Sequence, residues 1–168
     1  MAKKLLTTGF SLLEVMVVIA IFIILFSSVA TLTSDKTIRE DLDAQAQATV
    51  DILSRAHSYA VTSYYGDHWG IKLLNNSADC DVTEIDCVIL FKGTSYDTRN
   101  DEYDQKLLFN TGVYFDEQVN NEFYFQKSSG WLFDDGSPLA EKALILQTNL
   151  GSQKIVTSTP AGLIYYGD

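Results

Sequence analysis

The chain has 168 residues, which is enough for one domain with a buried core and too few for two domains of ordinary size. Apolar residues make up 46% and charged residues 20%, as expected for a globular and not a disordered chain. The formal net charge is −10. Because an acidic protein is repelled by phosphate backbones, we do not expect nucleic acid as a partner.

The first element is an almost charge-free segment over residues 10–33. Lys3 and Lys4 precede it, and positive charge before an apolar run is typical of the cytoplasmic end of a membrane segment. As a helix, its 24 residues would extend about 36 Å, more than the roughly 30 Å of a bilayer core. The segment therefore predicts a transmembrane helix.

Glu14 is the exception within this apolar segment. A carboxylate in an apolar environment costs at least a few kcal/mol unless it finds a partner, so such a residue is a candidate functional site. Cleavage after Gly9 would create an amine at Phe10, and a neighbouring subunit shifted along the helix axis could place that amine beside Glu14. The pair would neutralise both charges and fix the axial register of the two subunits.

The run from Gly9 through Phe10 and Glu14 to Val15 resembles the signal of type IV pilins and type II secretion pseudopilins. The resemblance implies that residues 1–9 are a leader, which a prepilin peptidase removes before it methylates Phe10. It implies partners as well: other pilin-like subunits, the peptidase and an inner-membrane assembly platform. The expected location is the inner membrane, single-pass with the head in the periplasm, and later a periplasmic pseudopilus or a cell-surface filament.

Two other readings of this segment stay open. An ordinary secretory signal could end at the small residues Ser28–Ala30, but such apolar regions are normally free of charge, and Glu14 is not. A plain single-span anchor explains the length of the segment and explains neither the Gly9–Phe10 junction nor Glu14.

Beyond the apolar segment, the sequence predicts that one helix continues from about residue 11 to 63. No Gly or Pro occurs between Phe10 and Tyr65. Over residues 34–65 the helix should be amphipathic and pack on the rest of the chain. Its apolar stripe recurs at close to 3.6 residues and comprises Ile38, Leu42, Ala46, Val50, Leu53, Ala56 or His57, and Ala60.

After Gly66 the pattern changes to short segments rich in aromatic and β-branched residues, bounded by turn residues. Residues 66–168 therefore predict an antiparallel β head, since the connections are too short for helical crossovers. The expected fold is α+β, with a long N-terminal helix, half transmembrane and half amphipathic, packed on an antiparallel sheet or sandwich. The expected strands are 68–74, 87–92, 106–109, 113–116, 122–126, 131–134, 143–148, 154–159 and 163–166.

This head is similar to that of the H-type pseudopilins and FimT-like minor pilins, in which a small β head follows the helix and ends in a hairpin. The segments that carry the similarity are 143–148 and 153–165, together with 55–61 and 69–71. FimT-like DNA-uptake pilins place arginines near the C-terminus, where this chain has Leu163, Tyr165 and Asp168. The resemblance thus favours a minor subunit that does not bind DNA.

Cys80 and Cys87 predict a structural disulfide, because an exported chain meets oxidising conditions. The alternative is two buried free thiols, while redox and zinc motifs do not fit the spacing. The acidic runs around these cysteines and over 97–104 lack calcium-loop spacing, so we expect solvated loops and no metal or cofactor. His57 and His68 are expected to be structural.

The expected function is that of a structural subunit of a type IV pilus-like filament, in a type II secretion system. The alternative is a minor pilin of a type IV pilus or DNA-uptake apparatus, with a head that binds a ligand. The sequence contains no catalytic motif, and we expect no enzyme. A secreted enzyme behind an ordinary signal would instead have its mature N-terminus at Thr31.

Overall fold

A computed structural model describes residues 11–75, 77–81, 85–116 and 122–167, and only the backbone of 27–35. The chain divides into two compact units, Met1–Thr37 and Ile38–Asp168. Helix α1 covers Leu12–Val61 and contributes to both. Its length follows from the absence of Gly and Pro in this stretch, since either residue would weaken or break the helix.

The prediction of a transmembrane helix over residues 10–33 is wrong. Within the part of the chain that the structure describes, no helix combines the length and apolar character needed to cross a membrane. The membrane-spanning half of the expected fold and the expected location in the inner membrane with a periplasmic head are corrected accordingly.

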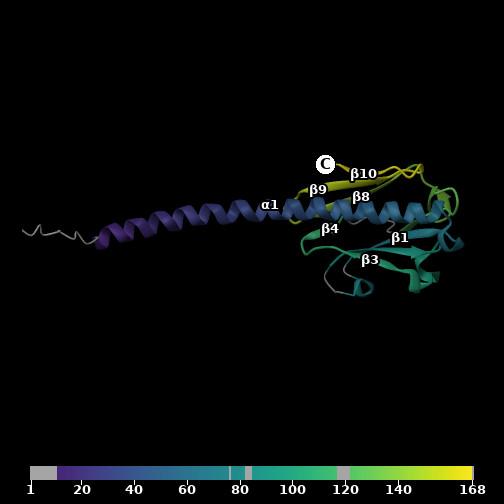
Figure 1. Ribbon diagram of the computed structural model, residues 1–168, viewed down its shortest axis with the longest axis horizontal. Coiled ribbons are helices and arrows are strands. Elements are labelled where there is room, and N and C mark those ends of the chain that lie inside the picture. The colour runs from purple at the N-terminus through teal and green to yellow at the C-terminus, as the bar shows by residue number, and fades with distance from the viewer. Residues whose placement is uncertain (1–10, 76, 82–84, 117–121, 168) are drawn as a thin grey trace, which may run out of the picture. The chain divides into compact units, whose positions relative to one another are not determined.

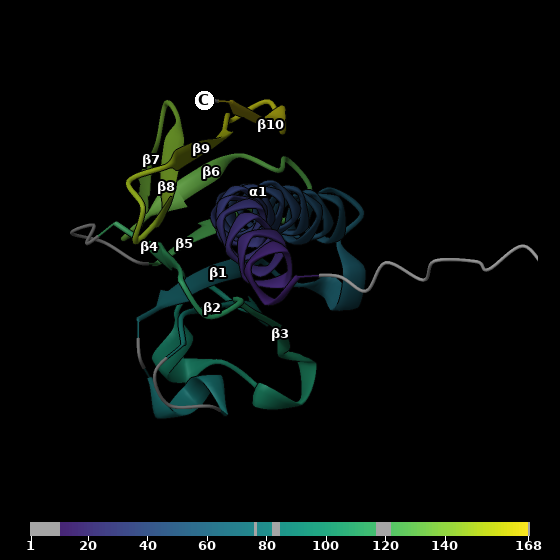
Figure 2. The same cartoon turned by 90° about the vertical axis from the view of Figure 1, so that its left-hand side faces the viewer.

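The second unit contains two antiparallel sheets, which flank the second half of α1 (Figures 1 and 2). The first sheet has the strand order β3-β2-β1-β5-β6-β7, and the second has the order β10-β9-β8-β4. The strands of the first sheet are β1 (Trp69–Leu74), β2 (Cys87–Lys92), β3 (Gln105–Leu108), β5 (Glu122–Phe125), β6 (Leu132–Asp134) and β7 (Ser137–Pro138). Those of the second are β4 (Val113–Phe115), β8 (Lys142–Thr148), β9 (Gln153–Ser158) and β10 (Ile164–Gly167).

The core of this unit forms between the helix and the two sheets. The helical stripe contributes fully buried side chains at Leu42, Ala46, Leu53, Ala56 and Ala60. The strands contribute aromatic and branched side chains on alternate positions, as a strand with one face inward requires. Among them are Trp69, Ile71, Phe123, Phe125, Leu144, Leu146 and Val156.

The carboxylate of Asp86 joins the two sheets. It is only 4% exposed, and its Oδ2 accepts a hydrogen bond from the buried backbone N–H of Phe115 at 2.9 Å. The same oxygen accepts from Asn75 Nδ2 at 3.2 Å. Asp86 precedes β2 of the first sheet, whereas Phe115 belongs to β4 of the second, so one side chain satisfies polar groups at the seam.

The predicted disulfide is confirmed. Cys80 and Cys87 are bonded and fully buried, together with Ile89, Phe91 and Tyr96 in a second small core. The bond ties a single-turn helix over Ala78–Cys80 to the first residue of β2. Its role is therefore structural, because neither sulfur is free to react.

His57 is held in a close contact where α1 meets two turns. A Cβ atom added at Gly130 or Gly162 would collide with its imidazole ring, so only glycine fits at both positions. The ring also meets Phe125 edge-on, with centroids 5.5 Å apart. Burial lowers the pKa of His57 below its usual range, because the charged form loses its hydration.

Replacing Asp86 with Ala should lower the free energy of unfolding by about 2–4 kcal/mol, because the buried N–H of Phe115 loses its acceptor. Urea unfolding of Asp86→Ala, Asp97→Ala and the parent chain measures this. Asp97 is exposed, and its replacement should change stability by less than about 0.5 kcal/mol. Equal effects of the two changes would contradict the role given to Asp86.

His57 should make the unit less stable in acid. Since its folded-state pKa is depressed, the unfolded chain binds the proton more readily, and stability falls as the pH drops below about 6.5. The loss is complete below the folded-state pKa. We expect His57→Gln to flatten this part of the stability curve between pH 7.5 and 5, measured by urea unfolding. An unchanged slope in the variant would show that His57 does not contribute.

Candidate functional site: an exposed apolar helix

The described start of α1 is fixed by Ser11. Its Oγ accepts a hydrogen bond from the backbone N–H of Leu13 at 3.3 Å, and its carbonyl accepts from Glu14 and Val15 at 3.0 and 3.2 Å. These bonds satisfy N–H groups that have no partner within the helix itself. Ser11 is thus the N-cap, and the helix begins at Leu12.

From Leu12 to Phe26 the helix presents apolar side chains in every direction. Thirteen large apolar residues in this stretch are each between 45% and 81% exposed. Phe22 and Phe26, one turn apart, stack on each other with centroids 6.1 Å apart and remain exposed. A contiguous apolar surface of this size marks an interaction site, because a monomer in water gains nothing from displaying it.

Glu14 is the acidic residue in the first turn of this helix, and it is exposed. As the third helical residue after the Ser11 cap, it occupies the position at which a glutamate favours helix initiation through the helix dipole. The structure thus gives Glu14 a local role besides the predicted pairing with an amine. Gly9 and Phe10, the predicted cleavage and methylation positions, lie outside the described residues.

This local role was readable from the sequence. Ser11-Leu12-Leu13-Glu14 is a capping-box pattern, Ser followed three residues later by Glu ahead of an apolar run. The cost of a carboxylate in apolar surroundings predicts a paired charge at Glu14, whereas its distance from Ser11 predicts helix initiation. Any functional test of Glu14 must therefore separate its charge from its effect on helix initiation.

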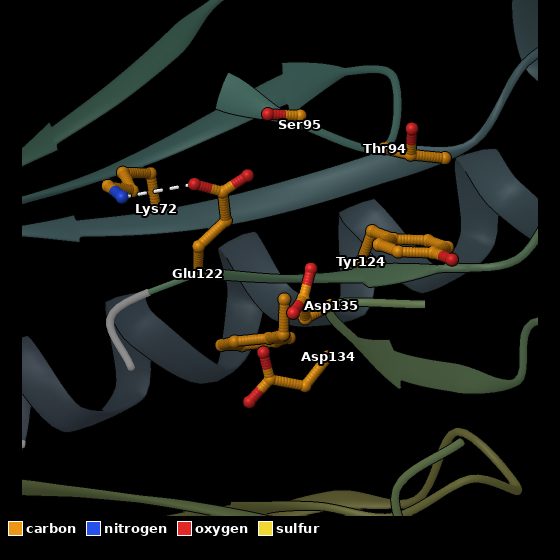
Figure 3. Close-up of a pocket in the computed structure, with 8 residues that line it drawn as sticks. Lys72, Thr94, Ser95, Glu122, Tyr124, Asp134 and Asp135 are labelled. Atoms are coloured by element: carbon orange, nitrogen blue, oxygen red, sulfur yellow. Dashed lines mark hydrogen bonds and ion pairs between the residues drawn. The ribbon is translucent and has the colours of Figure 1, made fainter. Parts of the chain in front are cut away.

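A second candidate region is a polar pocket of about 300 Å³ beside β1 and β5 (Figure 3). Lys72 Nζ lies 3.0 Å from Glu122 Oε2, and Glu122 Oε1 accepts from the backbone N–H of Tyr96 at 2.7 Å. The principal charges on this side of the pocket thus satisfy each other. Its lining residues are Lys72, Thr94, Ser95, Glu122, Phe123, Tyr124, Asp134 and Asp135.

One carboxylate in each of the acidic runs noted in the sequence forms an ion pair with a basic side chain. Arg99 Nε donates to Asp104 Oδ2 at 2.8 Å, and its guanidinium lies 3.4 Å from the ring centre of Tyr96. Lys106 Nζ lies 2.8 Å from Asp81 Oδ2. Over the described residues, no three His, Cys, Asp or Glu side chains are grouped so that they could hold a metal ion.

Comparison with known proteins adds no relative: no protein family, curated protein or solved structure matches this chain. The candidate site therefore depends on the chain's own residues, and the exposed apolar helix is its strongest feature.

Ser11→Ala should loosen the first turn of α1 by about 1 kcal/mol, because the N–H of Leu13 loses its acceptor. Amide hydrogen exchange of Leu13 and Glu14 should become several-fold faster, while amides in the second unit keep their rates. Ser11→Asp, which can still cap, should retain slow exchange. Equal exchange in all three chains would contradict the capping role.

Proposed function

We propose that the chain is a structural subunit of a pilin-like filament, in which copies associate through the N-terminal part of α1. The observation that supports this most strongly is the exposed apolar surface over Leu12–Phe26. Fully burying one such side chain contributes about 1.5–3 kcal/mol, so burying thirteen outweighs the cost of association by a wide margin. A surface that is apolar on all sides suits a helix surrounded by several others, and identical copies of this chain supply them.

Glu14 gives this association its register. Once neighbouring helices exclude water from the segment, a lone carboxylate would cost several kcal/mol. The proposal assigns processing to the Gly9–Phe10 junction, which gives each subunit an amine at Phe10. Placed beside Glu14 of the next subunit, that amine neutralises the charge at one axial offset only. Methylation of the amine would preserve its positive charge.

More specifically, we propose a minor subunit of a type II secretion pseudopilus. This part of the proposal rests on the resemblance of residues 9–14 and of the C-terminal hairpin to pseudopilin sequences. The second unit fits a subunit with a structural role, because its buried groups are used for packing. Asp86 joins the sheets, Cys80 and Cys87 are bonded, and His57 is enclosed by glycines.

The test compares chains that begin at Phe10 and carry either Glu14, Glu14→Gln or Glu14→Ala. Removing the carboxylate leaves the neighbour's amine uncompensated, which costs about 3–5 kcal/mol per contact. The concentration at which multimers appear in sedimentation velocity should rise at least about 100-fold for Glu14→Gln. Because glutamine still completes a capping box, this variant separates charge from helix initiation.

Two controls sharpen this test. Acetylation of the Phe10 amine should weaken assembly as much as Glu14→Gln, since it removes the other charge of the pair. Glu40→Gln, the same change at an exposed glutamate farther along α1, should leave assembly unchanged. If Glu14→Gln assembles like the parent chain, the pairing is refuted. If no chain forms multimers, the filament proposal itself is refuted.

A further inference from the structure

The outer strands of the two sheets differ in how they are protected against pairing with other chains. Exposed sheet edges usually carry a charge, a proline or a covering group, because an open edge is a template for another strand. In the first sheet, β7 includes Pro138, which has no N–H to offer. At the other edge, β3 carries the charged residue Lys106. Its neighbours Gln105 and Leu107 form the hydrogen-bonded pairs with β2, so the backbone groups of Lys106 point to the open edge.

The outer strand β4 of the second sheet is covered in another way. The backbone N–H of Asp116 donates to the carbonyl of Ile145 in β8. Because successive residues of an outer strand direct their backbone groups alternately toward and away from the neighbouring strand, those of Phe115 point away from β8. The outward N–H of Phe115 donates to Asp86 Oδ2, and its carbonyl accepts from Asn75 Nδ2 at 3.5 Å. Side chains that lie next to strands of the first sheet thus occupy the backbone N–H and C=O groups to which another strand would bind.

The remaining outer strand is β10, and it has no such protection. Ile164–Gly167 contains no charged residue and no proline. The backbone N–H of Thr159 donates to the carbonyl of Leu163, so the hydrogen-bonded positions toward β9 are Leu163, Tyr165 and Gly167. The N–H and C=O groups of Ile164 and Tyr166 therefore point to the open edge, and among the described strands β10 is the last on that side.

This edge is complementary to itself. The two residues with outward backbone groups, Ile164 and Tyr166, lie on either side of Tyr165. If a second β10 approaches antiparallel across a two-fold axis at Tyr165, Ile164 of one copy faces Tyr166 of the other. Each of these two facing pairs exchanges two hydrogen bonds. The strands carry no charge that would oppose this pairing.

We propose that β10 is a homotypic interface, through which two copies of this chain join their second sheets edge to edge. The two Tyr165 side chains then form the close, non-hydrogen-bonded pair of the ladder, in which aromatic residues stabilise each other. Tyr165 is 49% exposed and Leu163 is 62% exposed, so the interface also covers apolar surface. This contact is independent of Leu12–Phe26 and joins subunits through their second units.

Disulfide trapping in the full-length chain tests the interface. The only two cysteines are bonded to each other, so Tyr165→Cys introduces the single free thiol, and two-fold pairing places two of them side by side. Mild oxidation should give a covalent dimer on a non-reducing gel. The matched control is Leu150→Cys, on the β8–β9 turn, which is 55% exposed and should cross-link at least about tenfold more slowly.

A second variant separates edge pairing from random collision. Tyr166→Pro, added to Tyr165→Cys, removes an N–H that points outward and leaves the ladder with β9 intact. Two-fold symmetry makes this a loss of two hydrogen bonds, so cross-linking should slow about tenfold or more. Thermal unfolding checks that the sheet is retained.

The outcomes are distinct from those of the filament test. Cross-linking of Tyr165→Cys that survives Glu14→Gln and is lost with Tyr166→Pro supports the interface, whatever the fate of the filament proposal. Equal cross-linking at positions 165 and 150, or no effect of Tyr166→Pro, overturns it. Absence of any covalent dimer also overturns the homotypic interface.

Discussion

The described structure depends most on the burial of one helical stripe between two sheets. Leu42, Ala46, Leu53, Ala56 and Ala60 are 0–2% exposed, at spacings of three, four or seven residues that keep them on one face of α1. Three of the five are alanines, which let the strands approach the helix closely. Among the described residues, no other element of comparable length covers the inner face of either sheet, so both depend on this stripe for their core.

The same helix begins with a surface of the opposite kind. Over residues 12–26 its large apolar side chains are exposed on all sides, whereas over residues 38–60 its large apolar side chains are buried or half-buried. The absence of Gly and Pro makes the two stretches one helix. If the first stretch associates with other copies, the same helix links each associated segment to its own folded second unit, as a filament subunit requires.

The sequence predicted the elements better than their assembly. The helix, expected over 11–63, covers Leu12–Val61, and periodicity sufficed because no breaker interrupts it. The strands agree to within one or two residues, except β7, whose two residues include Pro138 and carry no periodic signal. The division into two sheets depends on pairings between distant residues, such as β1 with β5, which local patterns do not encode.

The candidate site was predictable in part. The apolar run and Glu14 are visible in the sequence, and so is the capping pattern that begins at Ser11. The membrane-spanning prediction over residues 10–33 was wrong, since no helix among the described residues combines the length and apolar character that it needs. Asp86 covers the outer edge of β4, whereas the outer edge of β10 is open. Both features depend on which residues of an outer strand direct their backbone groups away from the sheet, and only the three-dimensional strand pairing reveals this.

The most direct test of the central claim is sedimentation velocity of the chain that begins at Phe10 beside a variant of it in which Ile19, Ile23 and Phe26 are all glutamine. These residues share one face of the exposed helix and lie far in sequence from the core of the second unit. We predict large multimers for the parent chain and no species larger than a dimer for the variant, because pairing through β10 does not involve this helix. A parent chain that sediments as a monomer, or a variant that assembles equally well, would contradict association through this helix.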